Sequence, residues 1–71
     1  MTDTSRLRQI IMDKGLKMSY ICERMGITYS TLRRKIDNES EFTASEIAAL
    51  GDLLDMSEQV RTAIFFARKG E

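Results

Sequence analysis

Apolar residues recur at helical spacing in five short segments of the chain, and none of these segments shows β-type alternation. Within a segment the apolar positions lie about three or four residues apart, which places them on one face of an α-helix. The sequence contains no proline. The pattern predicts that residues 1–71 form a single all-α domain, a compact bundle of five short helices. Its predicted inward-facing residues include Leu7, Ile10, Ile11, Ile21, Cys22, Met25, Leu32, Ile36, Ile47, Leu50, Leu54, Val60 and Ile64.

The first two helices have different end signals. Asp3 or Thr4 is expected to cap the first helix, which stops at Gly15, where a left-handed residue ends a helix without a Cβ penalty. The second helix is expected over about residues 18–25. Lys17 is a poor N-cap for it, so either Ser19 caps a shortened helix or the first turn frays.

The last two helices also carry clear start signals. Thr43 and Glu46 form a capping box, in which hydroxyl and carboxylate each accept a hydrogen bond from the other's backbone amide. Phe42, just before it, is expected in the core, and Ser57 is expected to cap the last helix. Gly51 inside the fourth helix costs about 1 kcal/mol relative to alanine, so another backbone is expected to pass close to it.

The segment from Met18 to Ile36 contains the most specific signal. Gly26 follows the last apolar residue of one helix, Ile27 is an apolar plug, and Thr28 can cap the next helix, expected over about residues 29–37, with Asn38 as a left-handed stop. This order is that of a helix-turn-helix, whose second helix enters the major groove of DNA.

The outward face of that second helix is polar and basic. It is predicted to carry Tyr29, Ser30, Arg33 and Arg34. Arginine matches the O6 and N7 acceptors of guanine with its planar fork. Two other interpretations stay open: the arginines form an ordinary solvated helix face, and Tyr29 packs on the preceding helix.

The same residues resemble a known family. The run GLKMSYICERMGITYSTLRRKIDN is similar to the Cro/Xre-like helix-turn-helix domain of phage repressors and their bacterial relatives, whose pattern reads roughly GLTQEELAEKLGISRSTLSRKING. The similarity continues through EFTASEIAALGDLLDMS and covers about residues 5–67. It departs at Lys17 and Met18, where the family often has Thr and a phosphate-touching Gln. The resemblance implies a lambda-repressor-like five-helix bundle.

The resemblance also implies roles for individual residues. Tyr29, Ser30 and Arg34 align with base-contacting positions, and Arg33 faces the same groove or its phosphates. Phosphate contacts orient such a domain without reading sequence. Candidates for them are the amides at the start of the second helix and the side chains of Lys17, Thr28 and Lys35.

Charge is segregated along a chain whose formal net charge is zero. From Arg6 to Lys35 there are eight basic and two acidic residues, a net charge of plus six. From Asp37 to Glu58 there are seven acidic residues and no basic one. The basic half contains the predicted reading helix, which favours a nucleic-acid partner.

Composition argues against several other functions. The chain has no histidine and one cysteine, Cys22, expected as a small buried residue, so neither a disulfide nor a zinc site is expected, and no cofactor. It also has no glycine-rich phosphate loop, so enzymatic activity is not expected of this chain. No stretch of about 18 apolar residues exists and the first residues do not resemble a signal peptide. These features predict a cytoplasmic protein with no membrane partner and no small-molecule substrate, and the resemblance to phage repressors implies a bacterial host cell.

Ile64, Phe65 and Phe66 form the candidate dimerisation surface, just before the basic end Arg68 and Lys69. Three consecutive residues spread over roughly 200° of a helix, so at least one must face outward. An exposed pair of Phe65 and Phe66 would mark an interface, and a symmetric dimer would match a near-palindromic operator. The alternative is that both rings cover the base of the bundle and the chain is monomeric until DNA joins two copies.

The function predicted from these observations is a sequence-specific transcriptional regulator of phage or mobile-element type that binds double-stranded DNA. The alternative is an antitoxin-like or antirepressor-like module on the same fold that binds another protein. Glu39 and Glu41, in the acidic half, could supply the surface for such a partner. Strong salt dependence of duplex binding would separate the two.

Overall fold

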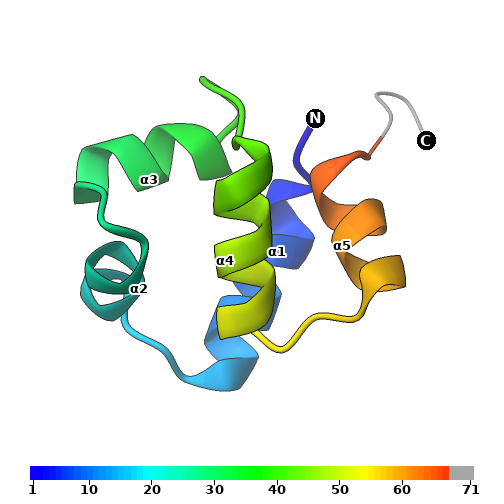
Figure 1. The fold of residues 1–71 in the computed structure, drawn as a ribbon, viewed down its shortest axis with the longest axis horizontal. Coiled ribbons are helices and arrows are strands. Elements are labelled where there is room, and N and C mark those ends of the chain that lie inside the picture. Colours follow the sequence, from blue (N-terminus) through cyan, green and yellow to red (C-terminus); the bar gives the residue numbers. More distant parts are fainter. Residues whose placement is uncertain (68–71) are drawn as a thin grey trace.

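Five α-helices form at the five predicted segments (Figure 1). A computed structural model describes residues 1–67, and this part of the chain contains no β-strand. The longest helix has 11 residues, and none of the five is long and apolar enough to cross a membrane. The helices are α1 (Thr4–Lys14), α2 (Met18–Met25), α3 (Tyr29–Ile36), α4 (Ala44–Leu53) and α5 (Glu58–Phe65).

The predicted capping chemistry is confirmed in four of the five helices. Asp3 accepts the amide of Arg6 at the start of α1, and the helix ends at Gly15, whose φ is 68°. Thr43 and Glu46 form the expected capping box of α4. Ser57 caps α5 by accepting the amide of Val60. Local sequence therefore sets where these helices begin.

The second helix begins without a side-chain cap. Lys17 occupies the N-cap position with extended backbone angles, and its side chain makes no capping hydrogen bond. The helix still starts at Met18, because the Lys17 carbonyl accepts the amide of Ile21 at 3.1 Å. The expectation that Ser19 caps a shortened helix is therefore wrong.

The core lies between all five helices, with α4 in the middle (Figure 1). Helix α4 packs against α2 on one side and α5 on the other, while α2 also contacts α3 and α1 contacts α5. Phe42 is buried as expected, with its ring edge-on to that of Phe65 at 5.2 Å between centroids and 78° between planes. The seven large side chains with almost no exposure are Leu7, Ile21, Leu32, Ile36, Leu50, Leu54 and Ile64.

Gly51 makes room for a side chain, and the expectation of a passing backbone is wrong. The guanidinium of Arg61, from α5, lies over Gly51, and a Cβ at this position would collide with it. The same guanidinium donates a hydrogen bond of 2.7 Å to Asp52. The glycine therefore lets Arg61 lie flat between α4 and α5.

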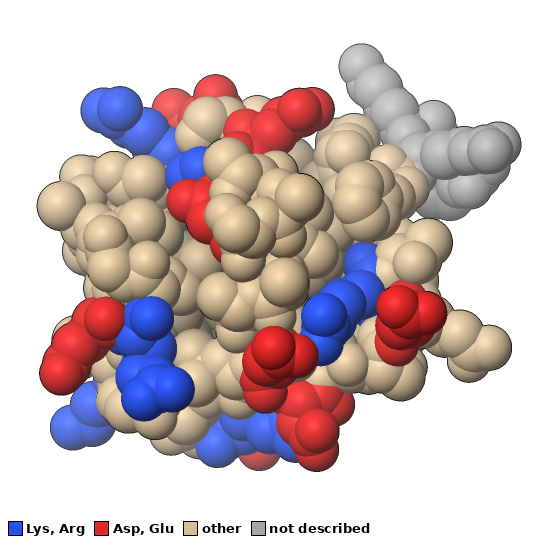
Figure 2. Space-filling view, in the orientation of Figure 1, with Lys and Arg blue, Asp and Glu red and all other residues tan. Residues whose placement is uncertain are grey.

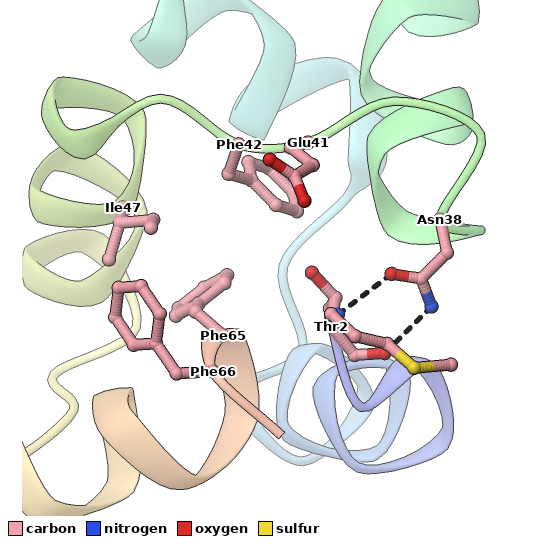
Figure 3. Close-up of a pocket in the computed structure, with 8 residues that line it drawn as sticks. Thr2, Asn38, Glu41, Phe42, Ile47, Phe65 and Phe66 are labelled. Carbon is pink, nitrogen blue, oxygen red and sulfur yellow. Dashed lines mark hydrogen bonds between the residues drawn. The ribbon is translucent and has the colours of Figure 1, made fainter. Parts of the chain in front are cut away.

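The N-terminal residues fasten α3 and α5 to the bundle. The amide of Thr2 donates to Oδ1 of Asn38 at 2.7 Å, and Nδ2 of Asn38 donates back to the Thr2 carbonyl at 2.8 Å (Figure 3). Asn38 has the predicted left-handed conformation, with φ 65°. The hydroxyl of Thr4 donates to the Ile36 carbonyl, and the amide of Asp3 donates to that of Ile64. The C-terminal end of α3 is thus held from outside its own helix.

Candidate nucleic-acid interface

The connection between α2 and α3 has the predicted turn chemistry. Gly26 ends α2 in the left-handed conformation, with φ 71°. The amide of Ile27 donates to the Cys22 carbonyl at 3.1 Å, and the half-buried Ile27 side chain packs on the core. Thr28 then caps α3 by accepting the amide of Thr31 at 3.2 Å. Three residues therefore join two short helices at a fixed angle.

The four candidate base-contacting residues lie on the solvent face of α3. Leu32 and Ile36 are fully buried, which fixes the inward side of the helix. At about 100° per residue, Ser30 and Arg34 fall on the opposite side, whereas Arg33 lies about 80° and Tyr29 about 40° from the middle of the buried side. All four are exposed, Tyr29 at 56%. The structure brings Tyr29, Ser30, Arg33 and Arg34 together on one outward surface, here called the α3 face.

The two arginines of this face differ in their surroundings. Nε of Arg33 lies 3.7 Å from Oδ2 of Asp37, the C-cap residue of α3, and the Arg33 side chain is 65% exposed. Arg34 has no ion-pair partner among residues 1–67. Both guanidinium groups remain accessible to a ligand, and that of Arg33 lies within ion-pair distance of an acid.

Lys35, a predicted phosphate contact, lies on another side of α3, where its ammonium already has partners within the protein. Its ammonium is 2.6 Å from Oε1 of Glu46 and 3.1 Å from the carbonyl of Glu41, and the side chain is only 12% exposed. At about 240° around the helix from Tyr29, it points toward α4 and away from the α3 face. Its charge serves the packing of α3 on α4.

The carboxyl group of Glu46 responds to this pairing. Burial alone would raise the pKa of Glu46, but the hydrogen bonds from Lys35 and from the Thr43 amide, together with the Lys35 charge, lower that pKa below its ordinary value of 4.5. The ionised form of Glu46 is therefore the form that fits the fold.

The other two phosphate candidates are placed differently. Lys17 is exposed at the first turn of α2, which lacks a side-chain cap. The hydroxyl of Thr28 already accepts the Thr31 amide and is hydrogen-bonded to the Thr31 hydroxyl at 2.9 Å. Lys17 is thus accessible to a ligand, and Thr28 acts first as the cap of α3.

Arg8 is a neighbour of the α3 face that the sequence pattern did not indicate. It lies on α1, and its Nη2 donates to Oδ1 of Asp37 at 2.7 Å, across 29 positions of sequence. Asp37 also faces Arg33. No local motif could have predicted this contact, because it depends on how α1 packs beside the end of α3.

The two charged halves of the chain meet in the folded protein. The ion pairs of Arg8 with Asp37 and of Lys35 with Glu46 each join a basic residue to an acidic one from the other half. On the side shown in Figure 2, acidic and basic side chains are interspersed around a mostly uncharged middle. The segregation seen along the sequence is therefore partly cancelled in space. Glu39 and Glu41 are exposed acids in the loop between α3 and α4.

The candidate dimerisation residues separate into core and surface. Ile64 is 0% and Phe65 4% exposed, so the expected exposed aromatic pair is wrong. Phe66 is 61% exposed and lines a hollow of about 120 Å³ with Phe42, Ile47 and the N-terminal residues (Figure 3). The expectation that at least one of the three faces outward is confirmed by Phe66. Arg68 and Lys69 lie outside the described residues.

Cys22 is buried in the core, as expected for a small packing residue. Within the described part of the chain, no group of three or more His, Cys, Asp or Glu side chains could hold a metal ion. Comparisons with family models, with curated proteins and with solved structures return no match to this chain. A function for the α3 face must therefore be argued from its residues and their geometry.

Proposed function

We propose that this chain is a sequence-specific transcriptional regulator of phage or mobile-element type that binds double-stranded DNA. In this proposal α2 and α3 are the helix-turn-helix of a lambda-repressor-like bundle, and α3 lies in the major groove. The observation that carries the proposal is the α3 face, where four hydrogen-bonding side chains are exposed on a helix that buries Leu32 and Ile36.

The chemistry of the α3 face suits base edges. The fork of Arg34 can donate two hydrogen bonds to O6 and N7 of guanine, and the hydroxyls of Tyr29 and Ser30 can donate or accept at either base. Tyr29 and Ser30 lie in the first turn of α3, beside the end of α2. Arg33 lies one turn from Tyr29 on the same side, so all four could reach neighbouring base pairs.

Backbone contacts in this proposal come from the start of α2. Lys17 is exposed there, and the uncapped amides of the first turn present the positive end of the helix dipole to a phosphate. Such contacts would set the position of the domain on DNA without reading its sequence. Lys35 is left out because Glu46 already binds it.

Regulation would follow from occupying an operator in the cytoplasm of a bacterial host. Two copies of the domain joined through Phe66 would present two α3 faces about one DNA turn, ~34 Å, apart on a near-palindromic site. The proposal requires no cofactor and no small-molecule substrate.

Binding to a random pool of duplexes tests the proposal. The protein should enrich a defined sequence, and its affinity should fall by a decade or more per few-fold rise in salt, as counterions are released from several phosphates. Failure to bind any duplex at low salt would contradict the proposal.

The acids beside α3 support a second candidate function. Asp37, Glu39 and Glu41 follow the reading helix directly, and they would repel the phosphates flanking a groove. An antitoxin-like or antirepressor-like module would instead use this surface to bind a basic partner protein. Replacing Glu39 and Glu41 by Lys discriminates between the DNA-binding and the protein-binding function. The substitutions should tighten DNA binding if α3 enters a groove. If the chain instead binds a basic protein through these acids, the substitutions should abolish that binding.

A further inference from the structure

We infer that Asp37 is a specificity-determining residue that acts by positioning Arg33: anchored by Arg8, it holds the Arg33 guanidinium so that its outer edge reads a guanine. The inference rests on the proposed function, because it assigns a base to one residue of the α3 face. It concerns Arg8 of α1, Arg33 of α3 and the C-cap residue of α3, and only Arg33 has a role implied by its place on the proposed reading helix.

The geometry places Asp37 between two arginines. Its Oδ1 accepts a hydrogen bond of 2.7 Å from Nη2 of Arg8, and its Oδ2 lies 3.7 Å from Nε of Arg33. The backbone of Asp37 is fixed as well, because its amide donates to the Arg33 carbonyl at 2.9 Å as α3 ends. The carboxylate therefore has a defined orientation before any ligand arrives.

This arrangement leaves the two terminal nitrogens of Arg33 available to donate hydrogen bonds to a base. The acid faces Nε, so the two terminal nitrogens at the other end of the guanidinium can point away from the protein. Guanine presents two acceptors, O6 and N7, that such a pair of donors matches. An ion pair that narrows the range of Arg33 conformations reduces the conformational freedom lost on binding a guanine, which favours this base over one that offers no such acceptors.

Arg34 provides the internal comparison. It lies on the same exposed face, but within residues 1–67 no acid pairs with it. Its contribution to base preference should therefore not depend on Asp37 or Arg8. A change at Asp37 should alter the preference at one base pair and leave the preference set by Arg34 intact.

Removing the charge of Asp37 should affect overall DNA affinity and base discrimination in opposite directions. Its carboxylate lies next to the surface that would face DNA phosphates, so removing the charge reduces repulsion for every duplex alike. Asp37→Asn should bind unrelated duplexes as tightly as the wild type or more tightly, while discriminating less well at one position. Simple loss of structure would weaken binding to all duplexes and lower the melting temperature.

The experiment measures base preference for the full chain and four variants. Sequences selected from a random duplex pool by the wild type, Arg33→Ala and Arg34→Ala identify the position read by each arginine. Asp37→Asn should reduce the preference for guanine at the Arg33 position by about two- to fivefold, the range of an exposed ion pair, and leave the Arg34 position unchanged. Arg8→Gln, which keeps the acid but releases its anchor, should reduce preference at the same position.

Each other result contradicts the inference in a recognisable way. Tighter binding of Asp37→Asn to all duplexes with an unchanged preferred sequence would show that the acid only repels phosphate. Weaker binding to all sequences, with a lower melting temperature and an unchanged profile, would show a purely structural role. If Arg8→Gln left the base preference at the Arg33 position unchanged, the claim that Arg8 anchors Asp37 would be contradicted. A wild type that selects no sequence would instead refute the proposed function itself.

Discussion

The ammonium of Lys35 lies 2.6 Å from Oε1 of Glu46, and this ion pair joins the C-terminal turn of α3 to the first turn of α4. Both side chains are mostly covered, at 12% and 18% exposure. Lys35 also donates to the Glu41 carbonyl, and Glu46 accepts the Thr43 amide. The pair therefore links α3, the loop after it and the capping box of α4 in one network.

Lys35→Ala should destabilise the protein by about 1 to 3 kcal/mol, because it leaves the covered Glu46 carboxylate without its partner. Urea unfolding followed by circular dichroism measures this directly. Arg34→Ala is the matched control on the same helix, and its exposed side chain should cost less than about 0.5 kcal/mol. Equal stability of the two variants would contradict the structural role assigned to Lys35.

The same network predicts a pH dependence. Because the fold lowers the pKa of Glu46 below 4.5, its ionised form contributes stability that is present above that pH and is lost as the pH falls through the folded-state pKa. The difference in unfolding free energy between the wild type and Glu46→Gln should therefore shrink as the pH is lowered from 7 to 3. Glu39→Gln, at an exposed position, is the control. A difference that does not change with pH would contradict the assignment.

Gly51 and Arg61 should be energetically coupled. Alanine at position 51 would gain about 1 kcal/mol of helix propensity, but its Cβ meets the Arg61 guanidinium and must displace it from Asp52. Gly51→Ala should consequently be more favourable in an Arg61→Ala background than in the wild type, by about 1 kcal/mol in a double-mutant cycle. Additive effects of the two substitutions would mean that Arg61 does not lie over the glycine.

Phe65, the last residue of α5, and Phe66, its C-cap, should respond differently to truncation. Phe65→Ala removes a buried ring that packs on Phe42 and should cost about 3 to 5 kcal/mol. Phe66→Ala should leave monomer stability nearly unchanged, because its ring is 61% exposed, and should weaken self-association. Sedimentation at micromolar concentration measures association. A wild type that stays monomeric and protects a single half-site on DNA would refute a dimer through Phe66.

Features that depend on neighbouring residues were predictable from the sequence. The caps at Asp3, Thr43 and Ser57 and the left-handed residues at Gly15 and Gly26 follow from chemistry within one helical turn. The buried positions Leu32 and Ile36 of α3 and the outward positions Ser30 and Arg34 also follow from the helical period, whereas the exposure of Tyr29 does not.

Features that depend on distant residues were not predictable. The sequence alone does not distinguish Lys35 from the other basic residues of α3, because its partner Glu46 lies on another helix. The contact of Arg8 with Asp37 likewise depends on how α1 packs beside the end of α3. Phe65 and Phe66 are adjacent and chemically identical, so only the position of α5 against Phe42 decides which ring is buried. In each case the tertiary packing decides the role.

The base preferences of single-residue variants of the α3 face test the central claim most directly. Arg34→Ala and Tyr29→Ala should each lose about 1 to 3 kcal/mol of discrimination at one or two base pairs of the selected sequence. Lys17→Ala, the matched control, should weaken binding to all sequences alike and leave the preferred sequence unchanged. Arg34→Ala and Tyr29→Ala proteins that stay folded and keep the wild-type preference at every position would contradict the claim that α3 reads DNA.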